Sequence, residues 1–123
     1  MPTIAVLGAS SIRSKFGNKC VRAYRAAGYK VFPVNPYEPE VEGLRTYPRL
    51  ADIGEPLDRI SVYLPPPVTL EMLPEIAAAG AGEVWLNPGA ADSKVVEEAR
   101  RRAIPIVQGC SIVNVGMSPA MFP

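Results

Sequence analysis

The chain has 123 residues, of which 48% are apolar and 20% charged, and its formal net charge is +1. This length suits one domain with a single core, and the near-neutral charge gives no support to general binding of nucleic acids. The chain has no histidine, which excludes Ser-His-Asp triads, Cys/His dyads and the commonest zinc ligand, so we expect neither catalysis by these side-chain sets nor a metal site.

The first predicted elements are a buried strand and a helix. Residues 3–8, TIAVLG, form a short continuous apolar run that ends at a glycine, as is typical of a strand covered on both faces of a parallel sheet. Apolar residues spaced three apart, from Val21 to Ala27, predict one face of a helix over residues 18–27. Gly28 follows at the position where helices commonly end.

A second strand is predicted at residues 29–35, YKVFPVN. Pro33 removes one ladder hydrogen bond from this strand and indicates an edge position or an irregularity. A loop with three acids and two prolines follows, PYEPEVEG. The remaining elements alternate in the same way: a short helix at 47–53, strands at 60–64, 83–87 and 104–108, and helices at 65–80 and 92–103.

Two details of the later helices can be predicted from single residues. Pro74 lies deep in the helix predicted at residues 65–80, where a proline is expected to kink or restart the helix. Asp92 or Ser93 is expected to cap the N-terminus of the helix that follows, since both side chains can accept a hydrogen bond from its first turn.

Five alternations of strand and helix predict an α/β fold. We expect a Rossmann-like, doubly wound, five-stranded and mostly parallel sheet with helices on both faces. Counting strands along the chain, the expected order in the sheet is 3-2-1-4-5. The tail at residues 111–123 shows no clear period, and we expect it to pack along the surface or to reach a partner.

Cys20 and Cys110 are the two cysteines of the chain. The sequence has no secretory hydrophobic region and no run near the roughly 20 apolar residues that a membrane span needs. We therefore expect a cytoplasmic protein with reduced thiols and no membrane association. Without a CxxC pair or a histidine, we interpret both cysteines as small core residues.

Ligands of open α/β sheets bind outside the carboxyl ends of the strands, where the strand order reverses. Four predicted strands end in segments rich in glycine, proline, serine or asparagine: Gly8-Ala9-Ser10, Asn35-Pro36-Tyr37, Leu64-Pro65-Pro66 and Asn87-Pro88-Gly89. None of these segments carries a carboxylate. This composition favours a bound anion over a site for proton transfer.

The turn after the first strand is suited to a phosphate. Gly8, Ala9, Ser10 and Ser11 allow a compact turn whose N–H groups, with the following helix N-terminus, can face an anion. Arg13 and Lys15 are the cations expected to close over it, and the chain has no acid before Glu38. The alternative is a tight turn beside solvated cations with no ligand.

The glycine fingerprint of NAD-binding turns, G-x-G-x-x-G, is absent here. Gly8 is followed by Ala9, Ser10 and Ser11, and the second strand ends in Asn35 instead of the acid that holds ribose hydroxyls. These features disfavour NAD. Nucleotides with an additional ribose phosphate, coenzyme A and NADP, both stay open.

Taken together, six motifs resemble the CoA-binding domain family, the single-domain relatives of the N-terminal domain of the succinyl-CoA synthetase α subunit. The motifs are AVLGAS, GYKVFPVNP, VEGLRTYPRLADI, ISVYLPPP, VWLNPGA and IVQGC. The resemblance spans roughly Ile4 to Cys110, and the ordered set is more specific than any one motif. It implies one CoA-binding domain over residues 1–123, with a core at about 3–110.

The resemblance also implies roles for single residues. The CoA phosphates would be held by Gly8, Ala9, Ser10, Arg13 and Lys15. The adenosine would be bordered by Asn35, Pro36 and Tyr37. The pantetheine arm would be lined by Pro65, Pro66, Asn87, Pro88 and Gly89.

The leading functional hypothesis from the sequence is a non-catalytic protein that binds CoA or an acyl-CoA, as a sensor or an accessory module. One alternative is an NADP-binding, oxidoreductase-like domain. Another is a component of an acyl-CoA ligase that acts with other chains. The expected partners are a small nucleotide ligand and, in addition, a protein partner or a second copy of the chain.

Overall fold

The sheet is built around β1 (Thr3–Leu7) in the computed structural model, which describes residues 1–123. Side chains alternate between the two faces of a strand. Ala5 and Leu7 accordingly belong to one buried apolar cluster, and Ile4 and Val6 to a second cluster on the opposite face. The continuous apolar run is therefore explained by burial of β1 on both sides, as predicted.

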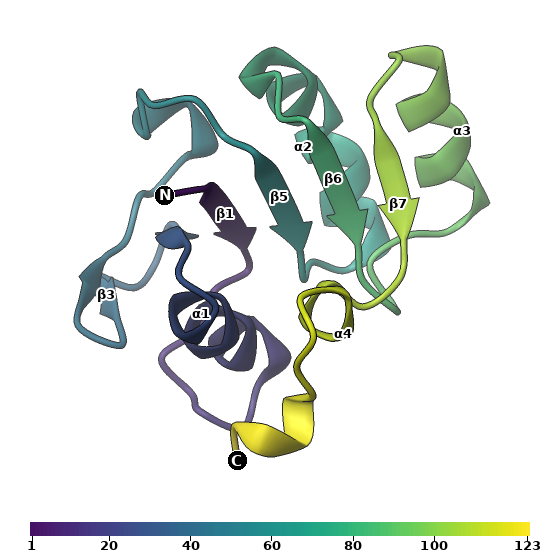
Figure 1. Cartoon of the computed structure of the whole chain (residues 1–123). Coiled ribbons are helices and arrows are strands. Elements are labelled where there is room, and N and C mark those ends of the chain that lie inside the picture. Colours follow the sequence, from purple (N-terminus) through teal and green to yellow (C-terminus); the bar gives the residue numbers. More distant parts are fainter.

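Five parallel strands form the main sheet (Figure 1). Their order is β2 (Lys30–Val34), β1, β5 (Arg59–Val62), β6 (Glu83–Leu86) and β7 (Ile106–Gln108). The α/β, Rossmann-like class is confirmed. Counted along the chain the order is 2-1-3-4-5, so the expected order 3-2-1-4-5 is wrong: the third strand pairs with the first and not with the second.

The outer edge of β2 explains this difference. The Pro33 carbonyl accepts a hydrogen bond from Tyr47 N (2.9 Å), and Asn35 N donates to the Tyr47 carbonyl (3.1 Å). Pro33 has no N–H, so this edge cannot offer a complete ladder to another strand. β5 pairs instead with the free side of β1, and β2 is the edge strand that Pro33 indicates.

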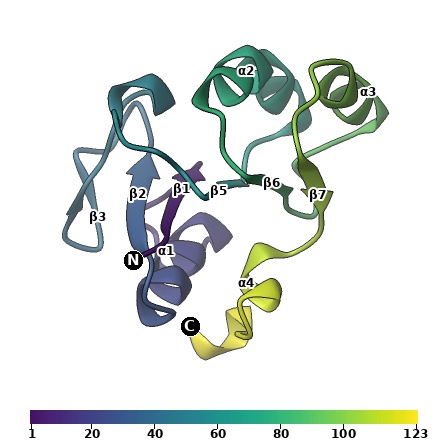
Figure 2. The ribbon, with the colours of Figure 1, turned by 45° about the horizontal axis from the view of Figure 1, so that its top comes forward.

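Helices cover both faces of the sheet, as predicted (Figure 2). One face carries α1 (Phe16–Ala26) and α4 (Ser111–Asn114), and the other carries α2 (Pro66–Ala79) and α3 (Ser93–Arg101). α2 continues through Pro74 as one helix and does not restart there. Asp92 caps α3, since its Oδ1 accepts from Val95 N at 3.0 Å. No helix of the structure is both long enough and sufficiently apolar to cross a membrane.

The acidic segment expected to be a loop contains a small hairpin of β3 (Glu40–Val41) and β4 (Leu44–Arg45). Its two-residue turn places Glu42 at φ 50° and Gly43 at φ 77°, as the type I′ turn of tight hairpins requires. A 3₁₀ turn, η1 (Leu50–Asp52), forms within the short helix predicted at residues 47–53. The hairpin was missed because its strands are too short to show a period.

The tail packs against α1 and forms α4 and a 3₁₀ turn, η2 (Pro119–Met121). Ile112 is fully buried in the apolar cluster beneath α1. The Tyr24 hydroxyl donates to the Ser111 carbonyl (2.8 Å), and Arg22 donates to the carbonyls of Phe122 and Pro123. The C-terminal segment thus contributes to the core as well as to the surface.

Candidate functional site

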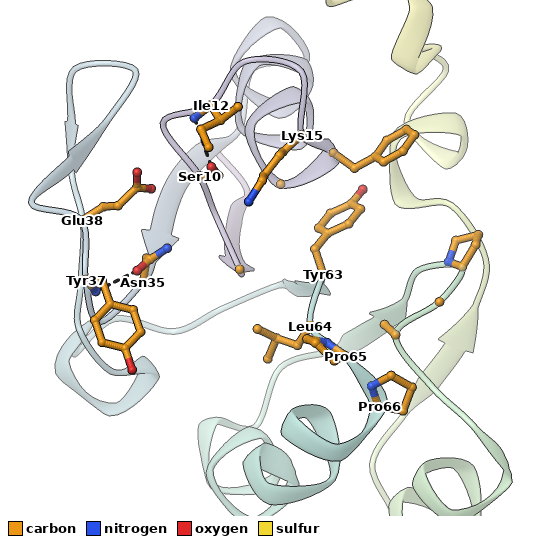
Figure 3. A pocket seen from close by; sticks show the side chains of 16 residues that line it. Ser10, Ile12, Lys15, Asn35, Tyr37, Glu38, Tyr63, Leu64, Pro65 and Pro66 are labelled. Atoms are coloured by element: carbon orange, nitrogen blue, oxygen red, sulfur yellow. Dashed lines mark hydrogen bonds between the residues drawn. The ribbon is translucent and has the colours of Figure 1, made fainter.

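A cleft of about 710 Å³ opens at the carboxyl ends of β1, β2, β5 and β6 (Figure 3). It lies where strand order reverses between β1 and β5, the position at which doubly wound sheets bind ligands. Sixteen residues line it: Gly8, Ser10, Ile12, Lys15, Phe16, Gly17, Asn35, Tyr37, Glu38, Tyr63, Leu64, Pro65, Pro66, Pro88, Gly89 and Ala90.

Three backbone segments meet closely at the centre of the cleft. Gly8 has φ +83°, and a Cβ placed on it would lie 2.2 Å from the Tyr63 carbonyl oxygen. A Cβ on Gly17 would lie 2.2 Å from the Gly8 carbonyl oxygen. Only glycine allows the end of β1 to approach both the end of β5 and the first turn of α1 at these distances.

The N-terminus of α1 and the Lys15 side chain make this wall of the cleft electropositive. Lys15 is the N-cap residue and has no side-chain capping bond. The N–H groups of Phe16 and Gly17 bond to no acceptor in the protein, as is usual for the first turn of a helix. Lys15 extends into the cleft (Figure 3) and is the only basic residue that lines it. This wall can therefore bind an anion.

Two acids lie beside the β1–α1 turn, although the strand ends suggested a turn free of carboxylates. Glu38 lines the cleft, where its Oε2 accepts from Ser11 N at 2.8 Å and its Oε1 accepts from the Ser11 hydroxyl. Glu42 accepts from Asn18 Nδ2 (3.1 Å) and Arg13 Nη2 (3.4 Å). The hydrogen bond from Asn18, aided by the Arg13 charge, holds the pKa of Glu42 below its ordinary value.

The lack of acids in the strand-end segments and before Glu38 therefore does not keep carboxylates away from this turn in the folded chain. The loop after β2 folds back onto the β1–α1 turn, across 27 residues for the Ser11–Glu38 contact and 29 for Arg13–Glu42. The sequence showed only that the acids come late in the chain.

Most of the site residues predicted from the sequence meet in this cleft. Those that line it are Gly8, Ser10, Lys15, Asn35, Tyr37, Pro65, Pro66, Pro88 and Gly89. Those that do not are Ala9, Ser11, Arg13, Pro36 and Asn87. The Ala9 side chain is buried in the core, and Arg13 faces Glu42. Of the two cations expected to close over a phosphate, the structure brings only Lys15 into the cleft.

Seven lining residues had been given no ligand contact, although Leu64 belongs to a strand end expected at the site: Ile12, Phe16, Gly17, Glu38, Tyr63, Leu64 and Ala90. Tyr63 and Leu64 follow β5 directly, so the end of that strand was a usable signal. Phe16 and Gly17 follow Lys15 at the start of α1, two residues before the helix expected from residue 18. Glu38 has no local signal, because only the fold of its loop brings it to the cleft.

Asn87 supports, through hydrogen bonds inside the protein, the β6 wall of the cleft, which consists of Pro88, Gly89 and Ala90. Its side chain is 2% exposed. Nδ2 donates to Ser61 Oγ and to the Val62 carbonyl, both at 2.9 Å, and Oδ1 accepts from Ser111 N at 2.9 Å. Asn87 thus connects β6 with β5 and with the start of α4.

The cysteines offer no reactive group to the cleft. Both are free thiols, and Cys20 is fully buried beside the hydroxyl of Ser61 (3.6 Å). Burial raises the pKa of Cys20 to about 11, so its thiol stays protonated. Burial also raises the pKa of the Tyr63 hydroxyl, which lacks a hydrogen-bond partner. No group of three or more Cys, Asp or Glu side chains is arranged to hold a metal ion.

The two ends of the cleft differ in polarity. On the β2 side, Asn35 Nδ2 donates to the Ala9 carbonyl and its Oδ1 accepts from Tyr37 N, each at 2.8 Å. These bonds fix the loop after β2 on the β1 turn, and the Tyr37 side chain stays exposed at the rim. On the β5 and β6 side the lining consists of Tyr63, Leu64, prolines, Gly89 and Ala90, and none of these residues carries a charge.

Known proteins resemble this chain at three levels. A family model described as CoA binding domain matches residues 2–116. The ADP-forming acetate–CoA ligase of Methanocaldococcus jannaschii is 26% identical over 113 residues, which are 85% of this chain and 16% of the ligase. The chain thus spans about a sixth of the length of that curated relative.

Two solved structures match the chain over nearly their whole length. A protein from Thermus thermophilus is 36% identical with a TM-score of 0.83, over 91% of this chain and 86% of that one. A conserved hypothetical protein from Pyrococcus furiosus is 29% identical with a TM-score of 0.85, over 93% of this chain and 99% of that one. Together with the family match over residues 2–116, these likenesses establish that the chain belongs to the CoA-binding domain family.

Proposed function

We propose that residues 1–123 act as one domain that binds coenzyme A or an acyl-CoA in this cleft and has no catalytic activity of its own. The observation that carries the proposal is the pairing of Lys15 with the open N-terminus of α1 at the reversal of strand order. This pairing suits a pyrophosphate, since backbone N–H groups, the helix dipole and one cation converge there.

The rest of the ligand follows from the two ends of the cleft. The adenosine lies on the β2 side, near Asn35 and the exposed ring of Tyr37. The pantetheine arm runs along the uncharged wall of Pro65, Pro66 and Gly89. A narrow, flexible arm needs contact area more than charge, and prolines offer a rigid apolar surface for it.

The absence of catalysis is supported by the state of the polar groups. Glu38 is the only carboxylate in the lining, and the Cys20 thiol is protonated and buried. No two titratable side chains in the cleft form the hydrogen-bonded pair that acid-base or nucleophilic chemistry uses.

A second candidate is a component of an acyl-CoA ligase that works with other chains. The similarity to the acetate–CoA ligase of Methanocaldococcus jannaschii favours it. Both candidates predict no activity of the isolated protein in an acyl-transfer assay, so this assay does not separate them. Co-purification with a second ligase chain would favour the ligase component. The NADP alternative gains no support, because the family match and this relative concern coenzyme A.

Calorimetry with CoA and acetyl-CoA tests the proposal. Lys15→Met is expected to lower the affinity by about 1–3 kcal/mol through loss of a charge-assisted hydrogen bond. Lys94→Met is the matched control, because Lys94 is exposed on α3 and does not line the cleft. No heat and no Tm shift with either ligand at millimolar concentration would rule the proposal out.

A further inference from the structure

The charge of the cleft does not match the charge of coenzyme A. Lys15 is the only basic residue in the lining, and Glu38 is the only acidic one. Coenzyme A carries a pyrophosphate and, in addition, a phosphate on the ribose 3′ oxygen. Lys15 and the α1 N-terminus suit the pyrophosphate, so the lining has no cation left for the ribose phosphate.

Neighbouring arginines do not supply that cation. Arg13 Nη2 lies 3.4 Å from Glu42, and Arg25 donates to the Glu42 carbonyl at 2.8 Å. Arg22 is directed to the tail, where it bonds to the carbonyls of Phe122 and Pro123. Each of these guanidinium groups thus has a partner elsewhere in the structure, and none of them lines the cleft.

Glu38 is fixed where the ribose is expected. It lies four residues after Val34, the last residue of β2, on the same side of the cleft as Asn35 and Tyr37 (Figure 3). Ser11 donates its N–H to one carboxylate oxygen and its hydroxyl to the other. A carboxylate has about four acceptor positions, so Glu38 can still accept hydrogen bonds from a ligand.

A carboxylate after the second strand has a known physical role in doubly wound folds. It accepts hydrogen bonds from free ribose hydroxyls, whereas a phosphorylated ribose is accommodated by a cation. We propose that Glu38 receives the ribose hydroxyls of the nucleotide, so that this cleft prefers an adenine nucleotide pyrophosphate with an unphosphorylated ribose to coenzyme A itself. This inference rests on the proposed function, because that function places the pyrophosphate at α1 and the adenosine beside β2.

The test compares CoA with dephospho-CoA, which lacks only the 3′-phosphate. The wild-type protein is expected to bind dephospho-CoA roughly tenfold more tightly, which corresponds to about 1.4 kcal/mol. Glu38→Gln removes the negative charge and should bring the ratio of the two Kd values near one. Glu38→Lys should reverse the preference. Glu40→Gln is the matched control, since it makes the same charge change on β3, outside the lining, and should keep the wild-type ratio.

Each outcome is decisive. If wild-type protein binds CoA as tightly as dephospho-CoA, or more tightly, the inference is overturned and the proposed function stands. If the preference exists but survives Glu38→Gln, Glu38 is not its source and the inference is again overturned. If neither ligand binds, the proposed function fails and the inference fails with it. The wild-type comparison needs no variant, so the test holds even if a substitution impairs folding.

Discussion

Two glycine turns form opposite walls of the cleft, and they differ in what surrounds them. Gly8 follows β1 with φ +83°, and Gly89 follows β6 with φ +88°. A Cβ on Gly8 would lie 2.2 Å from the Tyr63 carbonyl oxygen, whereas a Cβ on Gly89 would meet nothing within 4 Å. At Gly89, glycine is favoured only by the positive φ. At Gly8, glycine is favoured by the positive φ and also by the close contact with Tyr63, which leaves no room for a side chain.

The difference shows how each wall is held in place. The β1–α1 turn is enclosed by the backbones of β5 and α1, and Asn18 Nδ2 donates to the Ser10 carbonyl at 2.8 Å. In the β6–α3 turn, no atom lies within 4 Å of a Cβ placed on Gly89. This turn is held by the Asn87 side chain, whose Oδ1 accepts a hydrogen bond from Ser111 N in the protein interior. The wall that contains Gly8 and Lys15 is thus fixed by close packing, and the wall that contains Pro88 and Gly89 by one polar side chain.

Alanine at the two glycines should separate these requirements and give the largest effect. Gly8→Ala is expected to cost about 2–5 kcal/mol, the sum of about 1–2 kcal/mol for positive φ and about 1–3 kcal/mol for overpacking against Tyr63. Gly89→Ala, the matched control, should cost only the first of these, about 1–2 kcal/mol. Urea unfolding measures both. If the two variants lost equal unfolding free energy, β5 would have moved away from the new Cβ without cost. The two walls would then not differ in how tightly they are packed.

Asn87→Ala tests the anchor of the β6 wall and should have the next largest effect. It leaves Ser111 N–H and the Val62 carbonyl without their partner in the protein interior. The expected loss of unfolding free energy is about 2–3 kcal/mol. Pro88→Ala is the control, since Pro88 is exposed beside it and its replacement should cost at most about 1 kcal/mol. A similar small loss for Asn87→Ala would show that the wall does not depend on this side chain.

The sequence was sufficient for the elements that carry their own signal. The apolar run of β1, the helix after Pro65 and an N-cap at Asp92 or Ser93 follow from residues within one turn or one strand of each other. Such local patterns do not predict the strand order. It depends on which edge of β1 receives β5, and only Pro33 gave a hint, by marking β2 as an edge strand.

The candidate site was predictable where strand ends define it. Glycine, proline and asparagine at those ends led to the edge of the sheet where the cleft opens and to most of its lining. The acids were not predictable, because the contacts of Glu38 and Glu42 with the β1–α1 turn depend on a loop folding back across almost 30 residues. Asn87 was read as a ligand contact, yet its amide is used inside the protein.

The smallest expected effect concerns Glu42, which supports the close-packed wall through Asn18. The Asn18 hydrogen bond holds the pKa of Glu42 below its ordinary value of 4.5. The ionised carboxylate therefore stabilises the folded state fully above about pH 4.5, and this contribution is lost as the pH falls through the lower folded-state pKa. Glu42→Gln should lower the unfolding free energy at pH 7 by less than about 1 kcal/mol. Its unfolding curves should converge with those of the wild type in acid, while Glu40→Gln, on the same hairpin, should match the wild type throughout. A Glu42→Gln deficit that persists in acid would mean that Glu42 supports this wall by shape and not by charge.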